Sequence, residues 1–260
     1  MSKNEKTRDS LSLEGRRAVV TGSSSGIGRA IALELAAAGA ELVIHANRSV
    51  AEGEELREQI RARGGRCEFL QADLGAEGKA DDFFKAALDT LGSIDIWINN
   101  AGVDILTGER ARLSYEEKLD ALISVDLRAS MLLGRRAGAF MKEQGSGVIL
   151  NMGWDQAAVG MGGESGELFG AVKGAVMAFT KSLALGLAPE VRVNCLAPGW
   201  IRTAWGEEAP AEWQKRVLRE VPLERWGTPE DIARTTRFLV SDEASYINGQ
   251  VININGGAVT

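Results

Sequence analysis

The chain has 260 residues, of which 45% are hydrophobic and 25% are charged. Both fractions are close to those of ordinary globular domains, which excludes a chain that is disordered along its whole length. The formal net charge is −6 at pH 7, and this acidic balance excludes a broad nucleic-acid-binding surface. The length is compatible with one large α/β domain that buries a substantial core.

Signals for several other classes of protein are missing from the sequence. The first residues, MSKNEKTRDS, are polar, and no apolar run reaches the ~18 residues of a membrane span. The two cysteines, Cys67 and Cys195, form no CxxC motif, and the chain has a single histidine, His45. These features predict a cytoplasmic protein with no metal site, no membrane contact and no nucleic-acid partner.

Short apolar runs alternate with longer helical patterns along the chain. Strands are expected over residues 18–20, 42–44, 67–70, 94–98, 148–150, 191–196 and 250–254. Helices are expected over 27–38, 50–63, 79–91, 115–144 and 168–187. The strands are continuous apolar runs, so both of their faces should be buried. The pattern predicts a single-domain Rossmann-type α/β fold, a doubly wound parallel sheet of about seven strands with helices on both faces.

Two segments stand apart from this alternation. Residues 1–12 are expected to form a flexible tail in front of a single folded domain over 13–260. Residues 198–224 are less periodic and contain Trp200, Trp205 and Trp213. This segment is long for a loop in a compact domain, so we expect it to be a lid or a substrate-binding segment.

A turn rich in glycine and serine follows the first expected strand. Gly22, Gly26 and Gly28 have the spacing G-x-x-x-G-x-G, and a helical pattern comes directly after them. Glycines let the backbone approach a phosphate, and a helix N-terminus offers unpaired N–H groups with a partial positive charge. The turn therefore predicts a binding site for a dinucleotide pyrophosphate, with a plain connecting turn as the alternative.

Further motifs follow the later strands. NNAG at 99–102 follows the fourth strand, PGWIRT at 198–203 follows the sixth, PLERWGTPEDIA at 222–233 precedes a late helix, and GQVININGG occupies 249–257. Together with the glycine turn, they make the chain from about residue 13 onward resemble the short-chain dehydrogenase/reductase family. The branch that it resembles most contains the β-ketoacyl-carrier-protein reductases and related carbonyl reductases.

The resemblance implies a nicotinamide dinucleotide cofactor. In that family the glycine turn holds the pyrophosphate, an acid after the third strand contacts adenine, and the Asn-Ala-Gly segment lies along the adenosine ribose. The Pro-Gly motif lies against the nicotinamide. The cofactor-binding residues that it implies here are Gly22, Ser24, Ser25, Gly26, Ile27, Gly28, Asp73, Leu74, Asn100, Ala101, Gly102, Lys173, Pro198, Gly199, Ile201 and Thr203.

The end of the second strand distinguishes the two nicotinamide cofactors. A carboxylate at this place accepts a hydrogen bond from the ribose 2′-OH of NAD and repels the 2′-phosphate of NADP. The segment reads HANRS at 45–49 and contains no acid, whereas Arg48 and Ser49 could hold a phosphate. NADP(H) is therefore expected over NAD(H), with a solvated Arg48 at the start of the next helix as the alternative.

The catalytic positions depart from the family pattern. Family enzymes use an asparagine, a serine, a tyrosine that donates the proton, and a lysine that binds the nicotinamide ribose. The lysine is present as Lys173, but Phe169 occupies the tyrosine position. Asp126 occupies the asparagine position, and the serine position holds Trp154 or Gln156, depending on the direction of counting. Three of the four positions therefore lack their usual residue.

Another acid must donate the proton if the chain reduces carbonyl compounds. Asp155 is the first candidate, because it follows Trp154 at the carboxyl edge of the expected sheet, and apolar surroundings can raise the pKa of a carboxyl group. Asp155 could equally be a loop residue that caps backbone N–H groups. Glu164 and Glu167 are second choices, or they simply complement the dipole of the helix that follows.

Asp126 and the tryptophans have open roles. Asp126 could pair with Lys173, hold a water molecule or be an ordinary surface acid. Trp154 could stack on a flat ligand or on the nicotinamide, or could simply pack against its neighbours. Trp200 and Trp205 lie in the segment that covers the substrate in relatives, or they cover the end of the sheet. The expected substrate is therefore a small molecule with apolar or aromatic character.

Three functions follow from these observations. The preferred one is an NADP(H)-dependent oxidoreductase acting on a carbonyl or alcohol with a proton donor other than tyrosine. A catalytically inactive dinucleotide-binding sensor or partner subunit is the alternative, and lyase or isomerase chemistry in the same pocket is the third. The resemblance also implies a homotetramer or homodimer.

Overall fold

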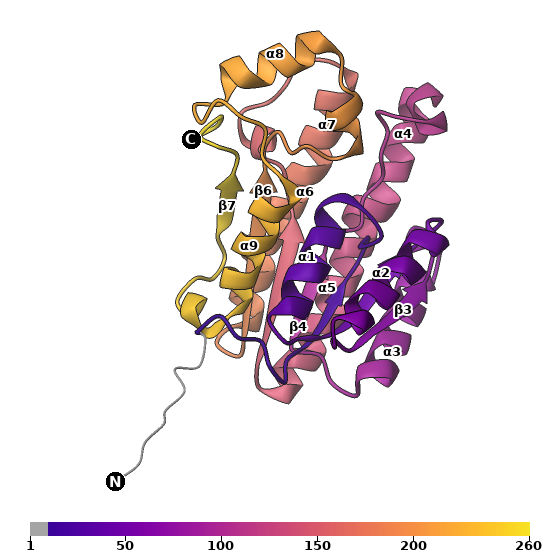
Figure 1. Cartoon of the computed structure of the whole chain (residues 1–260), viewed down its shortest axis with the longest axis vertical. Coiled ribbons are helices and arrows are strands. Elements are labelled where there is room, and N and C mark those ends of the chain that lie inside the picture. The colour runs from indigo at the N-terminus through magenta and orange to yellow at the C-terminus, as the bar shows by residue number, and fades with distance from the viewer. Residues whose placement is uncertain (1–9) are drawn as a thin grey trace.

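A parallel sheet with helices on both faces forms the body of the protein (Figure 1). The computed structural model describes residues 10–260, except for the side chains of Trp205 and Glu208. Within this described chain seven strands pair in the order β3-β2-β1-β4-β5-β6-β7, which confirms the expected doubly wound sheet. The strands are β1 (Arg17–Val20), β2 (Glu41–Ala46), β3 (Cys67–Gln71), β4 (Ile96–Asn99), β5 (Gly147–Met152), β6 (Val191–Pro198) and β7 (Val251–Ile254).

The helices alternate with these strands along the described chain. The α-helices are α1 (Gly26–Ala37), α2 (Val50–Ala62), α3 (Lys79–Leu91), α4 (Tyr115–Leu122), α5 (Ser130–Gln144), α6 (Glu164–Leu187), α7 (Ala204–Glu208), α8 (Ala211–Glu220) and α9 (Pro229–Val240). Shorter segments are the 3₁₀ helices η1 (Glu109–Arg112), η3 (Asp155–Ala158) and η4 (Asp242–Ala244), and the π-helix η2 (Ile123–Ala129).

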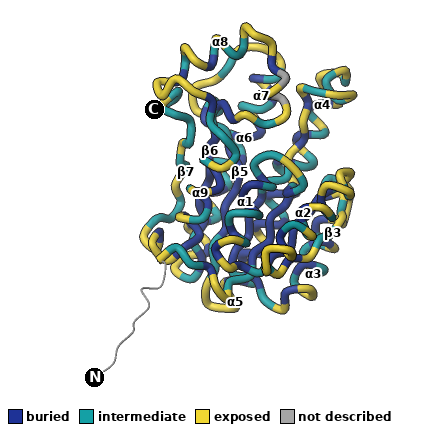
Figure 2. The backbone as a smooth tube through the Cα atoms, in the orientation of Figure 1, coloured by how far each residue is buried: buried dark blue, intermediate teal, exposed yellow. Residues whose placement is uncertain are grey.

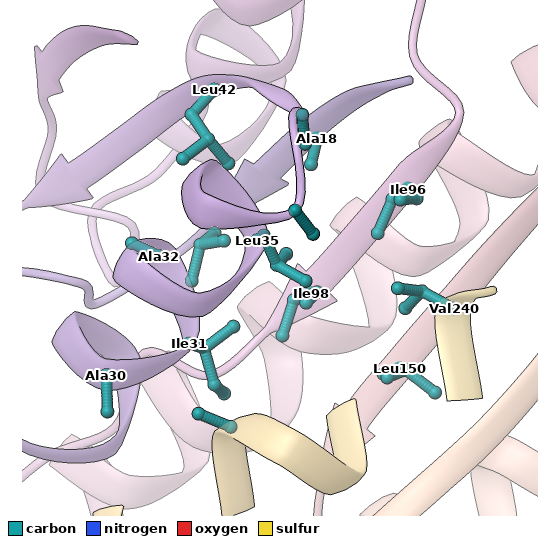
Figure 3. Close-up of a cluster of buried hydrophobic side chains, with 14 of the residues drawn as sticks. Ala18, Ala30, Ile31, Ala32, Leu35, Leu42, Ile96, Ile98, Leu150 and Val240 are labelled. Carbon is teal, nitrogen blue, oxygen red and sulfur yellow. The ribbon is translucent and has the colours of Figure 1, made fainter. Parts of the chain in front are cut away.

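Both faces of the sheet are buried at the five central strands, as the continuous apolar runs predicted, whereas the edge strands β3 and β7 are only partly buried. Successive residues of a strand point to opposite faces. Ile98 of β4 therefore packs in one core cluster with Ile31 and Leu35 of α1, which Figure 3 shows beside it. Its neighbour Trp97 packs in the second cluster, together with residues of α3, α5 and α6 such as Phe83. The central strands accordingly lie in the dark-blue interior of the tube in Figure 2, whereas the edge strands β3 and β7 are largely teal and yellow.

The sheet changes its winding direction between β1 and β4. The chain proceeds outward from β1 to β2 and β3, then returns to the other side of β1 with β4. In open α/β sheets, ligands bind in the crevice outside the carboxyl ends of two such strands. Figure 1 shows α7 and α8 beyond the carboxyl ends of β6 and β7, at this same edge of the sheet.

Three segments differ from the sequence-based expectation. The helix expected over 115–144 contains the π-helix η2 between α4 and α5, and π-helical turns occur frequently at functional sites. Helix α6 begins at Glu164, one turn before residue 168, because acidic residues in its first turn complement the helix dipole. The segment 198–224 contains α7 and α8, so it is more regular than a loop.

Helix α6 is long and apolar enough to cross a membrane by length and composition alone. In the fold it packs against β6 and α5 and carries the buried, charged Lys173. Burial of one face against the sheet thus accounts for part of its apolar character.

The expected flexible tail, 1–12, lies mostly outside the described residues. Residues 1–9 are not described, so that part of the expectation stays a prediction. The described end of the segment contacts α9, because the Leu11 carbonyl accepts a hydrogen bond from Arg237 Nε at 3.0 Å. Leu13, the first residue of the expected domain, is buried in the core.

Candidate functional site

The glycine turn passes very close to the segment that follows β4. Gly22 has a φ of +63°, and a Cβ atom there would lie 2.6 Å from Ala101 Cα. A Cβ atom on Gly28 would collide with the Gly22 carbonyl oxygen and with Asn100. Within the described chain, the Ser25 side chain makes no hydrogen bond that caps α1, so the first N–H groups of the helix are available for an anion. The turn therefore fits a pyrophosphate group.

Two polar side chains hold this turn against the end of β4. Asn100 Nδ2 donates to the carbonyl oxygens of Thr21 (3.0 Å) and Gly22 (2.9 Å). Thr21 Oγ1 accepts from the backbone N–H groups of Asn100 (2.9 Å) and Ala101 (3.0 Å). The glycine turn and the NNAG segment, which are far apart in the sequence, thus form one crevice.

His45 fixes the turn from the other side, a role that the sequence analysis missed. Its Nδ1 accepts a hydrogen bond from the Gly22 N–H (3.0 Å), and its Nε2 donates to the Ala72 carbonyl (3.0 Å). This arrangement requires the neutral tautomer. Burial lowers the pKa of His45 to about 4, against weaker opposing effects of Ala72 and Asp73. No local motif signals this role, because it depends on the pairing of β1 with β2.

The other predicted dinucleotide contacts lie along the same edge. Arg48 and Ser49 follow β2 and are exposed, so they are accessible to a phosphate group. Asp73 is exposed after β3, and its Oδ1 accepts a hydrogen bond from the Gly75 N–H at 3.1 Å. Leu74 is buried in the core beside it. These residues lie at the carboxyl ends of neighbouring strands, as a dinucleotide site in this fold requires.

A cavity of about 560 Å³ opens at the carboxyl edge between β5, β6, α6 and α8. Most of its lining side chains are apolar, as is usual for a small-molecule site. Eleven residues that the sequence analysis named line it, namely Ile27, Trp154, Glu164, Phe169, Lys173, Pro198, Gly199, Trp200, Ile201, Thr203 and Trp213.

Phe169, at the expected tyrosine position, meets Trp154, one of the two candidates for the serine position, in the wall of this cavity. Phe169 and Trp154 contact each other edge to face, with ring centroids 6.2 Å apart and planes inclined by 63°. Neither ring carries a hydroxyl group, so this wall offers apolar surface where the family pattern has proton-donating oxygen atoms.

Lys173 and Asp126 form a buried ion pair beside the cavity. Lys173 Nζ lies 2.9 Å from Asp126 Oδ1 and also donates to the Met152 carbonyl at 3.3 Å. The second carboxylate oxygen of Asp126 accepts from the Val103 N–H at 2.8 Å. The side chains are 11% and 2% exposed, respectively. Each buried charge therefore has a partner, which burial of charge requires, and η2 supplies the carboxylate.

Asp155 lies behind the cavity wall rather than in it. The residue is fully buried and is not among those that line the cavity. Its two oxygens accept from the Gln156 N–H (2.7 Å) and from Asn255 Nδ2 (3.0 Å). Burial raises the pKa of Asp155, while these hydrogen bonds lower it by smaller amounts. This geometry corresponds to the capping role, and it ties η3 to the C-terminal segment.

The first turn of α6 contributes further polar groups. Glu164 lines the cavity, where it pairs with Lys118 of α4 at 2.7 Å, whereas Glu167 is exposed and does not line it. Ser165 also lines the cavity and was missed by the sequence analysis. Its spacing of four residues from Phe169 puts both side chains on one helix face, but that signal depends on knowing that α6 begins at Glu164.

The glycine turn, the NNAG crevice and the cavity beside Lys173 together define a nicotinamide-dinucleotide-binding α/β protein. A sequence model of the family described as "Enoyl-(Acyl carrier protein) reductase" matches residues 22–259. A 3-oxoacyl-[acyl-carrier-protein] reductase of Synechocystis is 37% identical to this chain over 253 residues, which cover 95% of this chain and 98% of the relative.

Solved structures resemble the fold over almost its whole length. A short chain dehydrogenase of Burkholderia cenocepacia in complex with NADP has a TM-score of 0.85 at 32% identity, covering 95% of this chain and 98% of the other. A 7α-hydroxysteroid dehydrogenase complexed with NADH and 7-oxo glycochenodeoxycholic acid has a TM-score of 0.87 at 28% identity, covering 96% and 97%. The chain therefore belongs to the short-chain dehydrogenase/reductase family of NAD(P)-type oxidoreductases, in the branch similar to β-ketoacyl-carrier-protein reductases.

The close approach at Gly22 predicts that a single methyl group disturbs the phosphate site. We expect Gly22→Ala to weaken NADPH binding by on the order of 10-fold or more, because the new Cβ meets backbone and the φ is positive. Calorimetric titration measures this effect. Gly186→Ala is the matched control, since its Cβ would meet no atom within 4 Å. Equal affinity of both variants would contradict the role of the turn.

The buried neutral His45 predicts a pH dependence of stability. Its pKa is about 4 in the fold against 6.5 in the unfolded chain, so only the unfolded state gains a proton between these values. The contribution of His45 to the free energy of unfolding should therefore fall by about 3 kcal/mol as the pH drops from 6.5 to 4, and this contribution should not change further below that.

Urea unfolding of the wild type and of His45→Gln at several pH values measures this contribution as the difference between the two proteins. Because the chain has one histidine, its NMR signal reports the folded-state titration directly. A midpoint near 6.5 for that signal would contradict the buried, neutral ring.

The contacts of Asp155 predict a role in stability. We expect Asp155→Ala to lower the free energy of unfolding by about 1–3 kcal/mol, because the Gln156 N–H and Asn255 Nδ2 lose their acceptor. Urea unfolding provides the measurement, with the exposed Asp120→Ala as the control. Unchanged stability together with lost turnover would instead support Asp155 as the proton donor.

Proposed function

We propose that the chain is an NADP(H)-dependent oxidoreductase that interconverts a small carbonyl compound and its alcohol, with Lys173 in place of tyrosine as the proton donor. The observation that carries this proposal is the position of Lys173. Its ammonium group lies beside the cavity that Phe169 and Trp154 line, and it is held there by Asp126.

Two features support NADP(H) as the cofactor. The segment 45–49 places the exposed Arg48 and Ser49 after β2 and contains no carboxylate that would repel a 2′-phosphate. A relative that is 32% identical was solved in complex with NADP. NAD(H) is the less favoured alternative, and the complex of the hydroxysteroid dehydrogenase with NADH is an example in a more distant relative.

The residues of the cavity supply the proton chemistry. When bound, NADPH supplies the hydride that reduces a carbonyl carbon. The carbonyl oxygen then needs a proton. Lys173 Nζ has three N–H donors, of which Asp126 and the Met152 carbonyl accept two within the described chain. The third is left for a substrate oxygen or a ribose hydroxyl, and solvent can later return the proton to the amine.

A catalytically inactive dinucleotide-binding protein is the second candidate, and the apolar wall supports it. Phe169 and Trp154 cannot donate a proton, and loss of a positioned acid usually lowers a rate by ~10²–10⁴. Lys173 would then hold ribose hydroxyls without turnover. In this case the protein would act as a sensor of the cofactor or as a partner subunit.

Titration of the purified protein with NADPH and NADH, followed by quenching of tryptophan emission, tests the cofactor. We expect NADPH to bind about 10-fold more tightly than NADH or better, and Arg48→Ala to remove most of this preference, because a charge-assisted contact to the 2′-phosphate is lost. Failure of both dinucleotides to bind would remove both candidate functions.

A panel of ketones then separates the two candidates. For the oxidoreductase we expect NADPH oxidation that falls by about 10²-fold or more in kcat in Lys173→Met. Tight NADPH binding with no oxidation, and weak activity gained in the double variant Phe169→Tyr, Trp154→Ser, would favour the inactive protein. Product formation without a change in nicotinamide absorbance would select lyase or isomerase chemistry.

We also propose that the protein is a cytoplasmic homodimer or homotetramer. Large apolar side chains remain on the surface of the single chain, including Leu185 at 84% and Tyr246 at 103% relative exposure, which supports an interface between copies. The two cysteines are free and buried, which suits a reducing compartment.

A further inference from the structure

A second aromatic pair lines the cavity. Trp200 follows β6 and Trp213 lies on α8, with ring centroids 5.3 Å apart and planes inclined by 58°. Both line the cavity that Trp154 and Phe169 line from the side of β5 and α6. Two aromatic pairs from different elements therefore line the cavity, and such a lining suits a flat apolar molecule.

A guanidinium group lies against this second aromatic pair. The Arg216 Cζ atom lies 4.6 Å from the centroid of the Trp213 ring and 5.9 Å from that of Trp200. Such stacking holds the guanidinium plane in a fixed orientation. Arg216 also lines the cavity, although it comes from α8, a helix that none of the predicted cofactor contacts uses.

The charged side chains that line the cavity differ in whether their polar atoms already have partners. The Lys173 ammonium is shared between Asp126 and a carbonyl, and Glu164 is neutralised by Lys118. Arg216 donates from Nε to Glu220 at 2.7 Å, and its two terminal nitrogens donate to no acceptor within the described chain. Those two nitrogens form the edge of a guanidinium that matches a carboxylate with two parallel hydrogen bonds.

We propose that the substrate is a flat, apolar ring compound that carries a carboxylate, with the ring against the two aromatic pairs and the carboxylate on Arg216. The inference rests on the proposed function, because it concerns the same cavity. In this arrangement Arg216 decides specificity, while the reacting carbonyl or alcohol lies toward Lys173.

Calorimetric titrations with three probes test the proposal, each with and without saturating NADP⁺. The probes are 2-naphthoate, its uncharged analogue 2-naphthamide, and hexanoate, which has the carboxylate but no ring. We expect 2-naphthoate to bind at least about 10-fold more tightly than either comparator, because it alone uses both the aromatic pairs and the guanidinium. Equal binding of the acid and the amide, or no binding of naphthoate, would overturn the proposal.

Arg216→Gln and Arg219→Gln form a matched pair of variants. Both remove one positive charge from α8, but Arg219 is exposed and does not line the cavity. We expect Arg216→Gln to weaken naphthoate binding by about 10-fold or more while naphthamide changes by less than about threefold, and Arg219→Gln to change neither. An equal loss in both variants would overturn the assignment and indicate a general charge effect.

Glu220→Gln tests whether loss of the ion pair on α8, rather than loss of the guanidinium, is what weakens naphthoate binding. It removes the same salt bridge but keeps the guanidinium, so naphthoate should bind at least as tightly as to the wild type.

Loss of naphthamide binding in Arg216→Gln would reveal a damaged cavity. In that case Arg216→Lys, which keeps the charge without the planar fork, decides whether the carboxylate contacts residue 216. Partial recovery of naphthoate binding in Arg216→Lys would support the proposal. The absence of any recovery would overturn it. Failure of NADP⁺ to bind would count against the proposed function alone, because the probes are also titrated without it.

Discussion

The structure depends first on the burial of a parallel sheet on both faces. Helices must cover each face, so α1, α2 and α9 pack on one side and α3, α5 and α6 on the other. Only the edges and the ends of the strands remain for ligands. The carboxyl ends of β1 and β4, where the winding direction changes, place the glycine turn beside Asn100 and Ala101. His45 then fixes this turn from β2, so the phosphate site is a consequence of strand pairing.

A buried ion pair organises the rest of the site. Lys173 would be costly to bury alone, and Asp126 from the π-helical segment η2 lies 2.9 Å away. The same carboxylate accepts the Val103 N–H, which ties the segment after β4 to η2 and α6. With Phe169 and Trp154 in the cavity wall, this lysine is the charged group that remains where the family pattern has a tyrosine. The proposed function assigns the proton chemistry to this ion pair, because the rings of Phe169 and Trp154 carry no hydroxyl group.

Much of the fold and of the cofactor site was predictable from the sequence. Continuous apolar strands separated by helical patterns predict the doubly wound sheet, and the spacing of Gly22, Gly26 and Gly28 predicts a phosphate turn. Each of these signals is local, because it depends on backbone conformation or on side-chain periodicity within one element. The departures at Phe169 and Trp154 are equally visible, since they are read against a fixed spacing from Lys173 and from the end of the fifth strand.

The sequence by itself therefore determined the order of strands and helices, and it predicted the phosphate turn and a catalytic set without the usual tyrosine. The tertiary structure decided which side chains meet. It pairs Lys173 with Asp126, joins Asp155 to Asn255, and brings Arg216 of α8 to the cavity that Phe169 also lines. These contacts join residues that are distant in the chain, and their geometry is set by the packing of helices on the sheet, which no local pattern encodes.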